Sequence, residues 1–185
     1  MNCMSREITI ARFLMRIRPA PVAAFLKMLL GVRRREIMTP VGRFWIDPAS
    51  VLGLELLEHG IHERDVTQAI RQLLRPEDTF VDIGANEGYF AVLASVFVGE
   101  RGRVIAVEPQ SRLQEVLARN FTLNDCRNIV VERVAVSDRP SSARLKLTPS
   151  MNNSASGFAP AAIYPLPSES VQCIRLADLL ARHNV

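Results

Sequence analysis

TFVDIGANEGYF, residues 79–90, is the stretch that decides how this chain folds. A short apolar run rich in β-branched residues ends at Gly84, and Gly88 opens a long apolar segment. This pattern predicts a buried strand, a tight turn and a buried helix, the front edge of a nucleotide-type α/β fold. Gly84 would let the chain reverse direction. Gly88 would let the helix start close to the strand, or let a ligand approach the backbone.

The segments that follow extend this pattern into a β-α-β-α-β unit over residues 79–136. Residues 103–108 form the second strand, and a proline stops it. The helix after it begins at Ser111, where Gln114 completes a capping box. Residues 128–136 form the third strand. Strands that alternate with helices imply right-handed crossovers and a parallel sheet.

The sequence upstream predicts helices and a hairpin. Residues 8–17 form a basic amphipathic helix, and residues 22–30 form a second short helix. Residues 36–48 form a β-hairpin with its turn near residues 40–42.

Two further helices lead into the glycine turn. Ser50 is the N-cap of a short helix through residue 57, and Gly60 is its C-terminal stop. The next helix carries apolar residues at i, i+3, i+4, i+7 and i+8, which predicts one buried stripe. These residues are Val66, Ala69, Ile70, Leu73 and Leu74.

The pattern changes after residue 140. Residues 143–148 alternate, which predicts an antiparallel addition to the sheet. We expect a small polar loop over residues 152–157, an edge strand over residues 171–174 and the start of a helix at residues 176–182. We expect two parts in the whole chain. Residues 1–75 are a helical and hairpin extension that serves as a lid or substrate side, and residues 76–185 are the nucleotide-type domain.

The net charge of +4 is unevenly distributed. Residues 1–43 hold nine Arg and Lys against two Glu, so the remainder of the chain is slightly acidic. We expect a solvated basic face. The alternative is a basic patch that meets anionic lipid, nucleic acid or an acidic partner. Sparse aromatics, not interleaved with the basic residues, argue against nucleic acid. We therefore expect no nucleic-acid partner and, at most, a weak membrane-surface contact through residues 1–35.

Cysteine usage predicts a cytoplasmic protein without a metal. Cys3, Cys126 and Cys173 are far apart and form no C-x-x-C pair, so they offer no metal-binding pattern. An odd number of scattered cysteines predicts reduced thiols. No apolar run approaches the roughly 18–20 residues that cross a bilayer, and we expect no signal peptide.

The glycine turn has two ligand interpretations. A dinucleotide-binding turn needs G-x-G-x-x-G, in which the middle glycine makes room for a pyrophosphate. Here Asn86 replaces the middle glycine, and Glu87 would lie near the phosphate. Both features disfavour a diphosphate. They suit a cofactor that carries no phosphate, such as S-adenosylmethionine.

Two acidic residues accompany the turn. Glu108 ends the second strand 20 residues after Gly88, about the spacing of a ribose-binding acid. A carboxylate there can accept hydrogen bonds from both ribose hydroxyls. The alternative is a solvated carboxylate at the end of a strand. Asp82 has an alternative as well, because a buried carboxylate can simply bond backbone N–H groups in the turn.

Three motifs make the chain resemble the FkbM-type class I methyltransferases. They are VDIGANEGY at residues 81–89, GRVIAVEP at residues 102–109 and AVSD at residues 135–138. Further similarity lies in VGRFWIDP at residues 41–48, in Asn120 and Asn124, and in Asn153 with Ser154. The resemblance covers roughly residues 36–180.

The resemblance implies an α/β fold with a Rossmann-like class I methyltransferase sheet and an N-terminal helical and hairpin extension. It implies S-adenosylmethionine as the cofactor and a small-molecule or glycan acceptor, since family members methylate hydroxyls of sugars or secondary metabolites. It would place four residues around the methionine part, Glu108 on the ribose and Ala135 near the adenine. The four residues are Asp82, Gly84, Asn86 and Gly88.

One departure from the family pattern stands out. An I-K-x-D-V-E-G strand is expected after the helix that begins at Leu176, but the sequence ends at Val185. We therefore expect a sheet that is incomplete on its C-terminal side, as in a truncated member or one part of a longer assembly. Its first strand would have an open edge.

Three functions stay open at this stage. The first is an S-adenosylmethionine-dependent O-methyltransferase. The second is an inactive truncated remnant that binds the cofactor weakly or binds a protein partner. The third, an NAD-dependent oxidoreductase, is disfavoured by Asn86 and Glu87. The catalytic base is not identified, because His59 and His62 qualify only by residue type and are expected to be exposed at helix ends.

Overall fold

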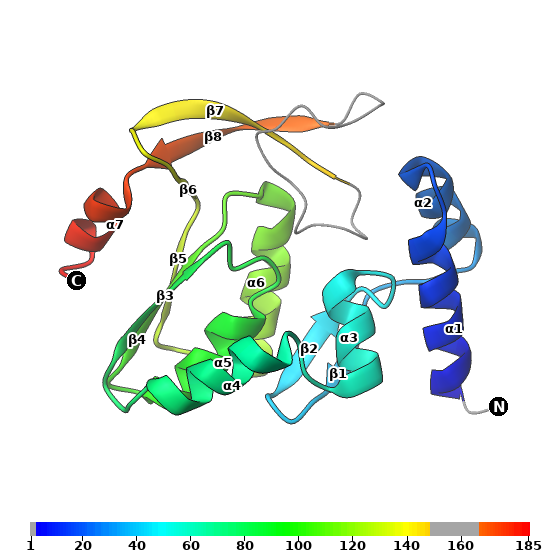
Figure 1. Ribbon diagram of the computed structural model, residues 1–185, viewed down its shortest axis with the longest axis horizontal. Helices are drawn as coiled ribbons and strands as arrows, with labels where there is room; N and C mark the ends of the chain where they lie inside the picture. The colour runs from blue at the N-terminus through cyan, green and yellow to red at the C-terminus, as the bar shows by residue number, and fades with distance from the viewer. Residues whose placement is uncertain (1–2, 149–166) are drawn as a thin grey trace.

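The computed structural model describes residues 3–148 and 167–185 (Figure 1). Its helices are α1 (Cys3–Arg16), α2 (Ala20–Leu29), α3 (Val51–His59), α4 (Arg64–Leu73), α5 (Tyr89–Val98), α6 (Ser111–Leu123) and α7 (Leu176–Arg182). Its strands are β1 (Arg35–Met38), β2 (Arg43–Ile46), β3 (Thr79–Ile83), β4 (Arg103–Val107), β5 (Ile129–Glu132), β6 (Ala135–Val136), β7 (Ser141–Lys146) and β8 (Ser168–Ile174). The polar loop predicted at residues 152–157, which includes Asn153 and Ser154, lies outside the described residues.

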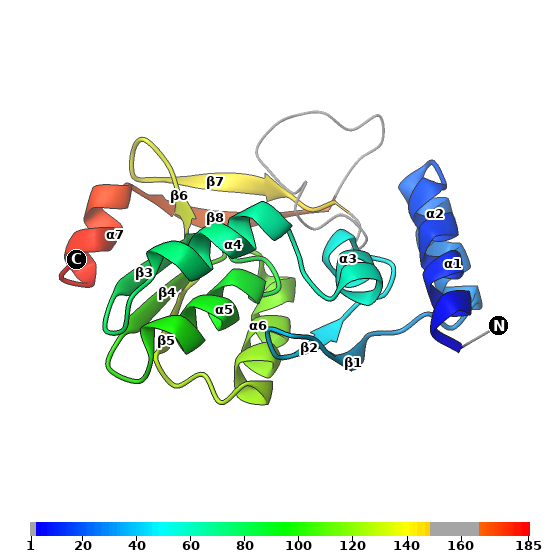
Figure 2. The ribbon, with the colours of Figure 1, turned by 60° about the horizontal axis from the view of Figure 1, so that its bottom comes forward.

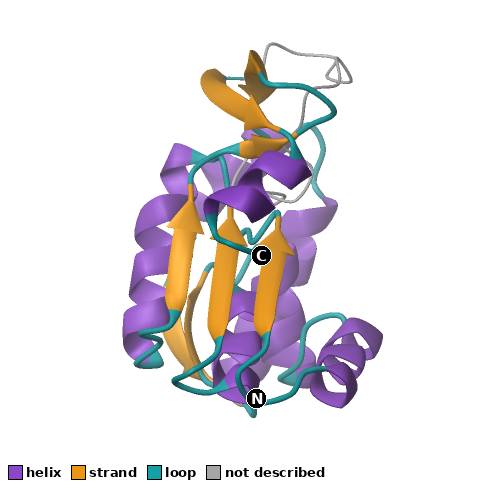
Figure 3. Ribbon diagram, turned by 90° about the vertical axis from the view of Figure 1, so that its left-hand side faces the viewer, coloured by secondary structure: helices purple, strands orange, loops and turns teal. Residues whose placement is uncertain are grey.

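The central sheet is parallel, with the strand order β3-β4-β5. Phe80 lies opposite Val104, and Val104 lies opposite Ile129. Helices α5 and α6 pack on one face, with α4 beside α5 (Figures 2 and 3). The prediction of an α/β fold with a parallel sheet is therefore confirmed. Among the described residues no strand pairs with the outer edge of β3, where half of the Ile83 surface is exposed.

The middle strand β4 is buried on both faces because its side chains alternate between two cores. Val104 and Ala106 pack in the main core with residues of α5 and α6. Ile105 and Val107 point to the opposite face, where they pack with Leu179 of α7. An uninterrupted apolar strand is what this two-sided burial requires.

Side-chain amides at the C-terminal end of α6, buried Asn120 and the C-cap Asn124, hold the hairpin β1–β2 against the body of the protein. Asn120 Oδ1 accepts a hydrogen bond of 2.7 Å from the Trp45 N–H, and Asn124 Oδ1 accepts one of 2.8 Å from the Arg43 N–H. Asn120 also donates through Nδ2 to the Glu87 carbonyl oxygen at 2.8 Å. One side chain therefore joins the hairpin, α6 and the glycine turn.

The prediction of one continuous third strand over residues 128–136 was wrong. The segment is split into β5, in the central sheet, and β6, which pairs in parallel with β8. Val134 lies between the two strands and is buried beneath α7 with Ile105 and Val107. Burying Val134 in this core bends the chain out of the central sheet.

The strand expected at the edge near residues 171–174 is instead the middle strand of a second sheet, ordered β6-β8-β7. β8 is long enough to pair with β7 along six residues and with β6 at its C-terminal end. The antiparallel addition predicted at residues 143–148 is confirmed as β7, which pairs with β8 over Ser141–Lys146.

The buried stripe predicted for α4 was partly right. Ile70 is buried and Leu74, just after the helix, packs against the main core, whereas Val66, Ala69 and Leu73 are exposed. Thr67 is buried as well, and its hydroxyl donates to the His62 carbonyl oxygen at 2.7 Å. A polar residue that apolar periodicity does not count therefore belongs to the buried face.

The capping box predicted at Ser111 is absent. Gln110 occupies the N-cap position, and the Ser111 hydroxyl donates instead to the Glu169 carboxylate on β8. Gln114 reaches back past the helix start and donates to the Glu108 carbonyl oxygen at 2.8 Å. Ser111 and Gln114 therefore connect α6 to β8 and to the end of β4, and they do not cap the helix.

Candidate functional site

The glycine turn that follows β3 is fastened to the end of β4. The N–H groups of Gly84 and Ala85 both donate to the Val107 carbonyl oxygen, at 2.8 Å and 3.0 Å. Gly84 has φ +84°, a conformation that favours glycine, and the space where its side chain would lie is open. This backbone can therefore be approached from outside.

Gly88 serves a different purpose. Its φ is +86°, and a Cβ atom there would lie 2.7 Å from Phe121 Cε1 and 2.9 Å from Leu117 Cδ2 on α6. The two roles considered for this glycine were a close approach of the helix to the strand and an approach by a ligand. The structure shows instead a close approach to α6.

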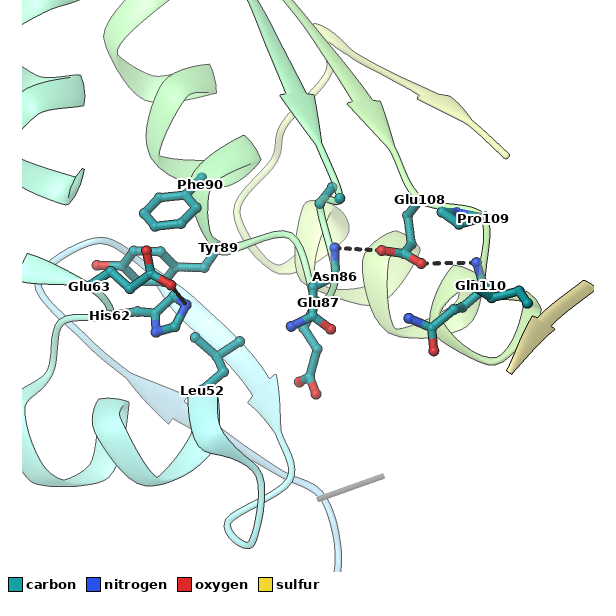
Figure 4. Close-up of a pocket in the computed structure, with 13 residues that line it drawn as sticks. Leu52, His62, Glu63, Asn86, Glu87, Tyr89, Phe90, Glu108, Pro109 and Gln110 are labelled. Carbon is teal, nitrogen blue, oxygen red and sulfur yellow. Dashed lines mark hydrogen bonds and ion pairs between the residues drawn. The ribbon is translucent and has the colours of Figure 1, made fainter. Parts of the chain in front are cut away.

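Glu108 points toward the turn and is only 3 % exposed. Its Oε2 accepts a hydrogen bond of 2.9 Å from the Asn86 N–H, and its Oε1 accepts one of 2.9 Å from the Gln110 N–H (Figure 4). Burial raises the pKa of Glu108, and the two backbone N–H groups oppose that rise. The alternative of a solvated carboxylate at the strand end was wrong, because this carboxylate is buried and oriented by backbone donors.

Glu87 is neutralised by a residue far away in the sequence. Its carboxylate forms a two-pronged ion pair with Arg34, with Nη1–Oε2 at 2.8 Å and Nη2–Oε1 at 3.0 Å. The Glu87 side chain is 1 % exposed, so the pair is almost fully buried at the carboxylate end. The guanidinium also donates to the Trp45 carbonyl oxygen at 3.2 Å. The glycine turn is thereby linked to the segment between α2 and the hairpin.

Asp82 lies inside β3 beside this turn. It is buried, and its Oδ2 has no hydrogen-bond partner within the described residues. Burial raises the pKa of Asp82 to about 7, the Ala91 N–H opposes the rise, and the Glu108 carboxylate adds to it. A buried carboxyl oxygen without a partner is costly, so the site favours a proton or a cationic group there.

This shift predicts a pH dependence of stability. Between about pH 4 and pH 7 the folded protein holds a proton on Asp82 that the unfolded chain has released. Raising the pH through this interval should therefore lower the free energy of unfolding, by up to about 1 kcal/mol per pH unit. Urea unfolding at several pH values measures the slope. The Asp82→Asn variant should lack this component, and an unchanged slope in that variant would contradict the assignment.

The turn, the end of β4 and the segment between α3 and α4 enclose a cavity of about 270 Å³ (Figure 4). It lies near the lower end of ligand pockets, which span roughly 300–1,000 Å³. Its lining residues are Leu52, His62, Glu63, Gly84, Ala85, Asn86, Glu87, Tyr89, Phe90, Glu108, Pro109, Gln110 and Leu145.

The structure brings some of the predicted site residues together and separates others. Gly84, Asn86 and Glu108 line the cavity, whereas Asp82 and Gly88 flank it without lining it. Ala135 is buried in β6 among residues of the second sheet and does not line the cavity. That these residues bind a cofactor stays a prediction.

His62, which the sequence offered only as a candidate by residue type, lines the cavity. It was expected to be exposed, but its side chain is only 13 % exposed, whereas that of His59 is 60 % exposed as expected. His62 Nδ1 lies 2.6 Å from Glu55 Oε2, and the ring packs against Tyr89 and Phe90 with centroid distances of 5.5 Å to each.

The local sequence held no signal for this histidine. Its partner Glu55 lies on the preceding helix, seven residues earlier, and its aromatic neighbours lie on α5. Only the tertiary structure assembles this group. Figure 4 shows His62 and Glu108 on opposite sides of Asn86.

The geometry fits a ligand site at the carboxyl ends of parallel strands, and comparison with known proteins identifies the family. The sequence model described as "Methyltransferase FkbM domain" matches residues 82–185, which is more than half of the chain. The chain belongs to the FkbM methyltransferase family. Within this FkbM-family chain the match starts at Asp82 and includes Glu108, whereas His62 and Arg34 precede it. No curated protein matches the chain.

Solved structures show partial similarity to this FkbM-family chain. An S-adenosylmethionine-dependent O-methyltransferase from Thermotoga maritima has 14% identity and a TM-score of 0.40, covering 57% of this chain and 51% of that one. An S-adenosylmethionine-dependent methyltransferase from Aquifex aeolicus has 22% identity and a TM-score of 0.37, covering 46% and 45%. Aeropyrum pernix fibrillarin with natively bound S-adenosylmethionine has 24% identity and a TM-score of 0.33, covering 39% and 32%. This chain thus spans about half or less of each.

Metal sites, cysteines and membrane-spanning helices are three further features to consider in the described part of the chain. No group of three or more His, Cys, Asp or Glu side chains there could hold a metal ion. Cys126 and Cys173 are free. Within residues 3–148 and 167–185, no helix has the length and apolar character needed to cross a bilayer.

Proposed function

We propose that this FkbM-family chain binds S-adenosylmethionine in the cavity and transfers its methyl group to a hydroxyl of a small-molecule or glycan acceptor. The observation that carries the proposal is the orientation of Glu108. Each of its carboxylate oxygens accepts one backbone N–H, and the carboxylate lines the cavity. The backbone donors fix the carboxylate in the cavity wall, where it can accept from ribose hydroxyls, and hydrogen bonds to a carboxylate are the stronger kind.

The charge of the cavity supports a cationic cofactor. Glu63 and Glu108 line it, and Glu87, which also lines it, is already paired with Arg34. A diphosphate would lie beside the Glu63 and Glu108 carboxylates, which is unfavourable for an anion. S-adenosylmethionine carries a sulfonium and an ammonium group. The buried Oδ2 of Asp82 has no hydrogen-bond partner within the described residues, and a cationic group nearby would stabilise it. The residues therefore fit this cofactor, which supplies an electrophilic methyl group when it is bound.

His62 is the group best placed to accept the proton that the acceptor hydroxyl releases. Glu55 contacts Nδ1, and two aromatic rings hold the imidazole in place. Nε2 lies 3.6 Å from Glu63 Oε1, beyond hydrogen-bond distance, so it keeps its lone pair for a substrate. A histidine oriented by a carboxylate is a common general base. This arrangement favours transfer to a hydroxyl, which must lose a proton.

Calorimetric titration with S-adenosylmethionine tests the cofactor proposal. Glu108→Gln should weaken binding about 10- to 100-fold, since one or two charge-assisted hydrogen bonds are lost. The amide would also direct an NH₂ group at the Asn86 or the Gln110 N–H. The control is Glu132→Gln, at the end of neighbouring β5 and outside the cavity lining, which should bind normally.

Two results would remove the proposal. One is wild-type protein that releases no heat with S-adenosylmethionine. The other is a folded Glu108→Gln variant with wild-type affinity. Transfer of a labelled methyl group to a panel of monosaccharides and hydroxylated metabolites then tests the acceptor class.

A further inference from the structure

Helix α2 turns its apolar face outward. Its exposed positions, together with the C-cap Leu30, are all apolar. The largest exposed fractions belong to Met28 at 68%, Leu29 at 64% and Phe25 at 55%. Val22, Phe25 and Leu29 are spaced i, i+3 and i+7, so they form one continuous stripe. A surface helix normally shows water its polar face, so this stripe calls for a covering surface.

The single charge of α2 points inward. Lys27 forms an ion pair with the buried carboxylate of Asp47, and the neighbouring Ala23 is buried against Leu14 and Ala49. The only charged side chain of α2 thus lies on its inward side, and its exposed side carries no charge. The orientation is fixed by these contacts, so the helix cannot rotate to bury its apolar stripe without breaking them.

Exposed basic side chains lie on α1 and just after α2. Arg6, Arg16 and Arg33 are exposed on α1 and after α2. Glu7 is the only acidic residue in residues 3–35, and it pairs with Arg35. The two helices lie side by side at the end of the molecule remote from α7 (Figures 1 and 2). The α1–α2 surface therefore combines an exposed apolar stripe on α2 with exposed arginines on α1 and just after α2.

We propose that the α1–α2 surface docks on an anionic lipid bilayer. The stripe enters the boundary between headgroups and acyl chains, and the arginines contact the acidic headgroups. α2 has 10 residues, about 15 Å of helix, so it lies in the plane of the membrane and does not cross it. A second copy of this chain fits the surface less well, because symmetric pairing would place two sets of arginines together.

Flotation with vesicles tests this docking on the full chain. Wild-type protein should float with vesicles that contain phosphatidylglycerol, more strongly at low than at high salt. Phe25→Ser with Leu29→Ser should lower the binding constant at least about tenfold. Arg16→Gln with Arg33→Gln should lower it about fivefold for each charge, and only on anionic vesicles. The matched control, Val66→Ser with Leu73→Ser, removes two exposed apolar residues from α4 and should bind like wild type.

A depth measurement identifies the contact directly. Phe25→Trp should be quenched by brominated lipids, whereas Leu73→Trp on α4 should show only the background of Trp45. The proposal is overturned if wild-type protein fails to float at low salt, or if a folded Phe25→Ser, Leu29→Ser variant floats like wild type. It is equally overturned if that variant instead abolishes self-association in sedimentation, which would make α2 a contact between copies.

Discussion

Replacing His62 with glutamine is expected to lower kcat for methyl transfer about 100- to 10,000-fold, the usual contribution of a general base. Glutamine has nearly the length of histidine and can still bond Glu55, but it cannot take a proton. S-adenosylmethionine affinity should change little, because the ring lies across Asn86 from Glu108. Labelled methyl transfer to the best acceptor of the panel measures the rate, and calorimetry measures the affinity.

A matched control separates a base from a residue that only fills space. His59→Gln is that control, since its ring is exposed at the end of α3, and this variant should keep the wild-type kcat. Equal losses in both variants would remove His62 from this role.

Replacing Arg34 with methionine is expected to lower the free energy of unfolding by about 3–5 kcal/mol. The change removes one partner of a buried pair and leaves the Glu87 carboxylate without its two short contacts. Methionine keeps much of the volume, so a cavity contributes little. Urea unfolding followed by circular dichroism measures the loss.

A double variant shows whether the loss comes from the stranded charge. Arg34→Met with Glu87→Met should recover most of the stability, since replacing a whole buried pair by apolar residues is often neutral. As a control, Arg101→Met breaks an exposed pair with Glu77 and should cost about 1 kcal/mol or less. If Arg34→Met costs no more than Arg101→Met, the buried pair is not a source of stability.

Local sequence was enough to predict the turn and its carboxylate. One apolar strand ends in a glycine and the next ends in an acid, and whether these two residues lie close together depends only on the order of the strands. Parallel neighbours put both at one edge of the sheet, so Gly84, Asn86 and Glu108 do line one cavity. The hairpin and the Ser50 cap were predictable for the same reason, since turn and cap residues act on their immediate neighbours.

Contacts between distant segments were beyond that reasoning. Arg34 lies 53 residues from Glu87, and only the folded chain shows that this carboxylate is neutralised. The placement of His62 depends on α3 and α5 together. Apolar periodicity gave only part of the buried face of α4, because it does not count Thr67, which is buried and held by a hydrogen bond. Likewise, an apolar residue at position 134 suits a continuous strand and equally suits the core beneath α7. The sequence therefore could not show that the strand breaks at Val134.

The amide of Asn120 has a consequence for how this protein could be divided. Three stretches separated by dozens of residues meet at one side chain, and Arg34 supplies a second such junction. A fragment beginning at residue 76 would lack Arg34, the ion-pair partner of Glu87, and would lack the hairpin that covers one face of α6. We expect such a fragment not to fold on its own. A chimera that takes its first half from a relative should therefore fold only if the residues that meet at Asn120 and the Arg34–Glu87 pair are kept compatible.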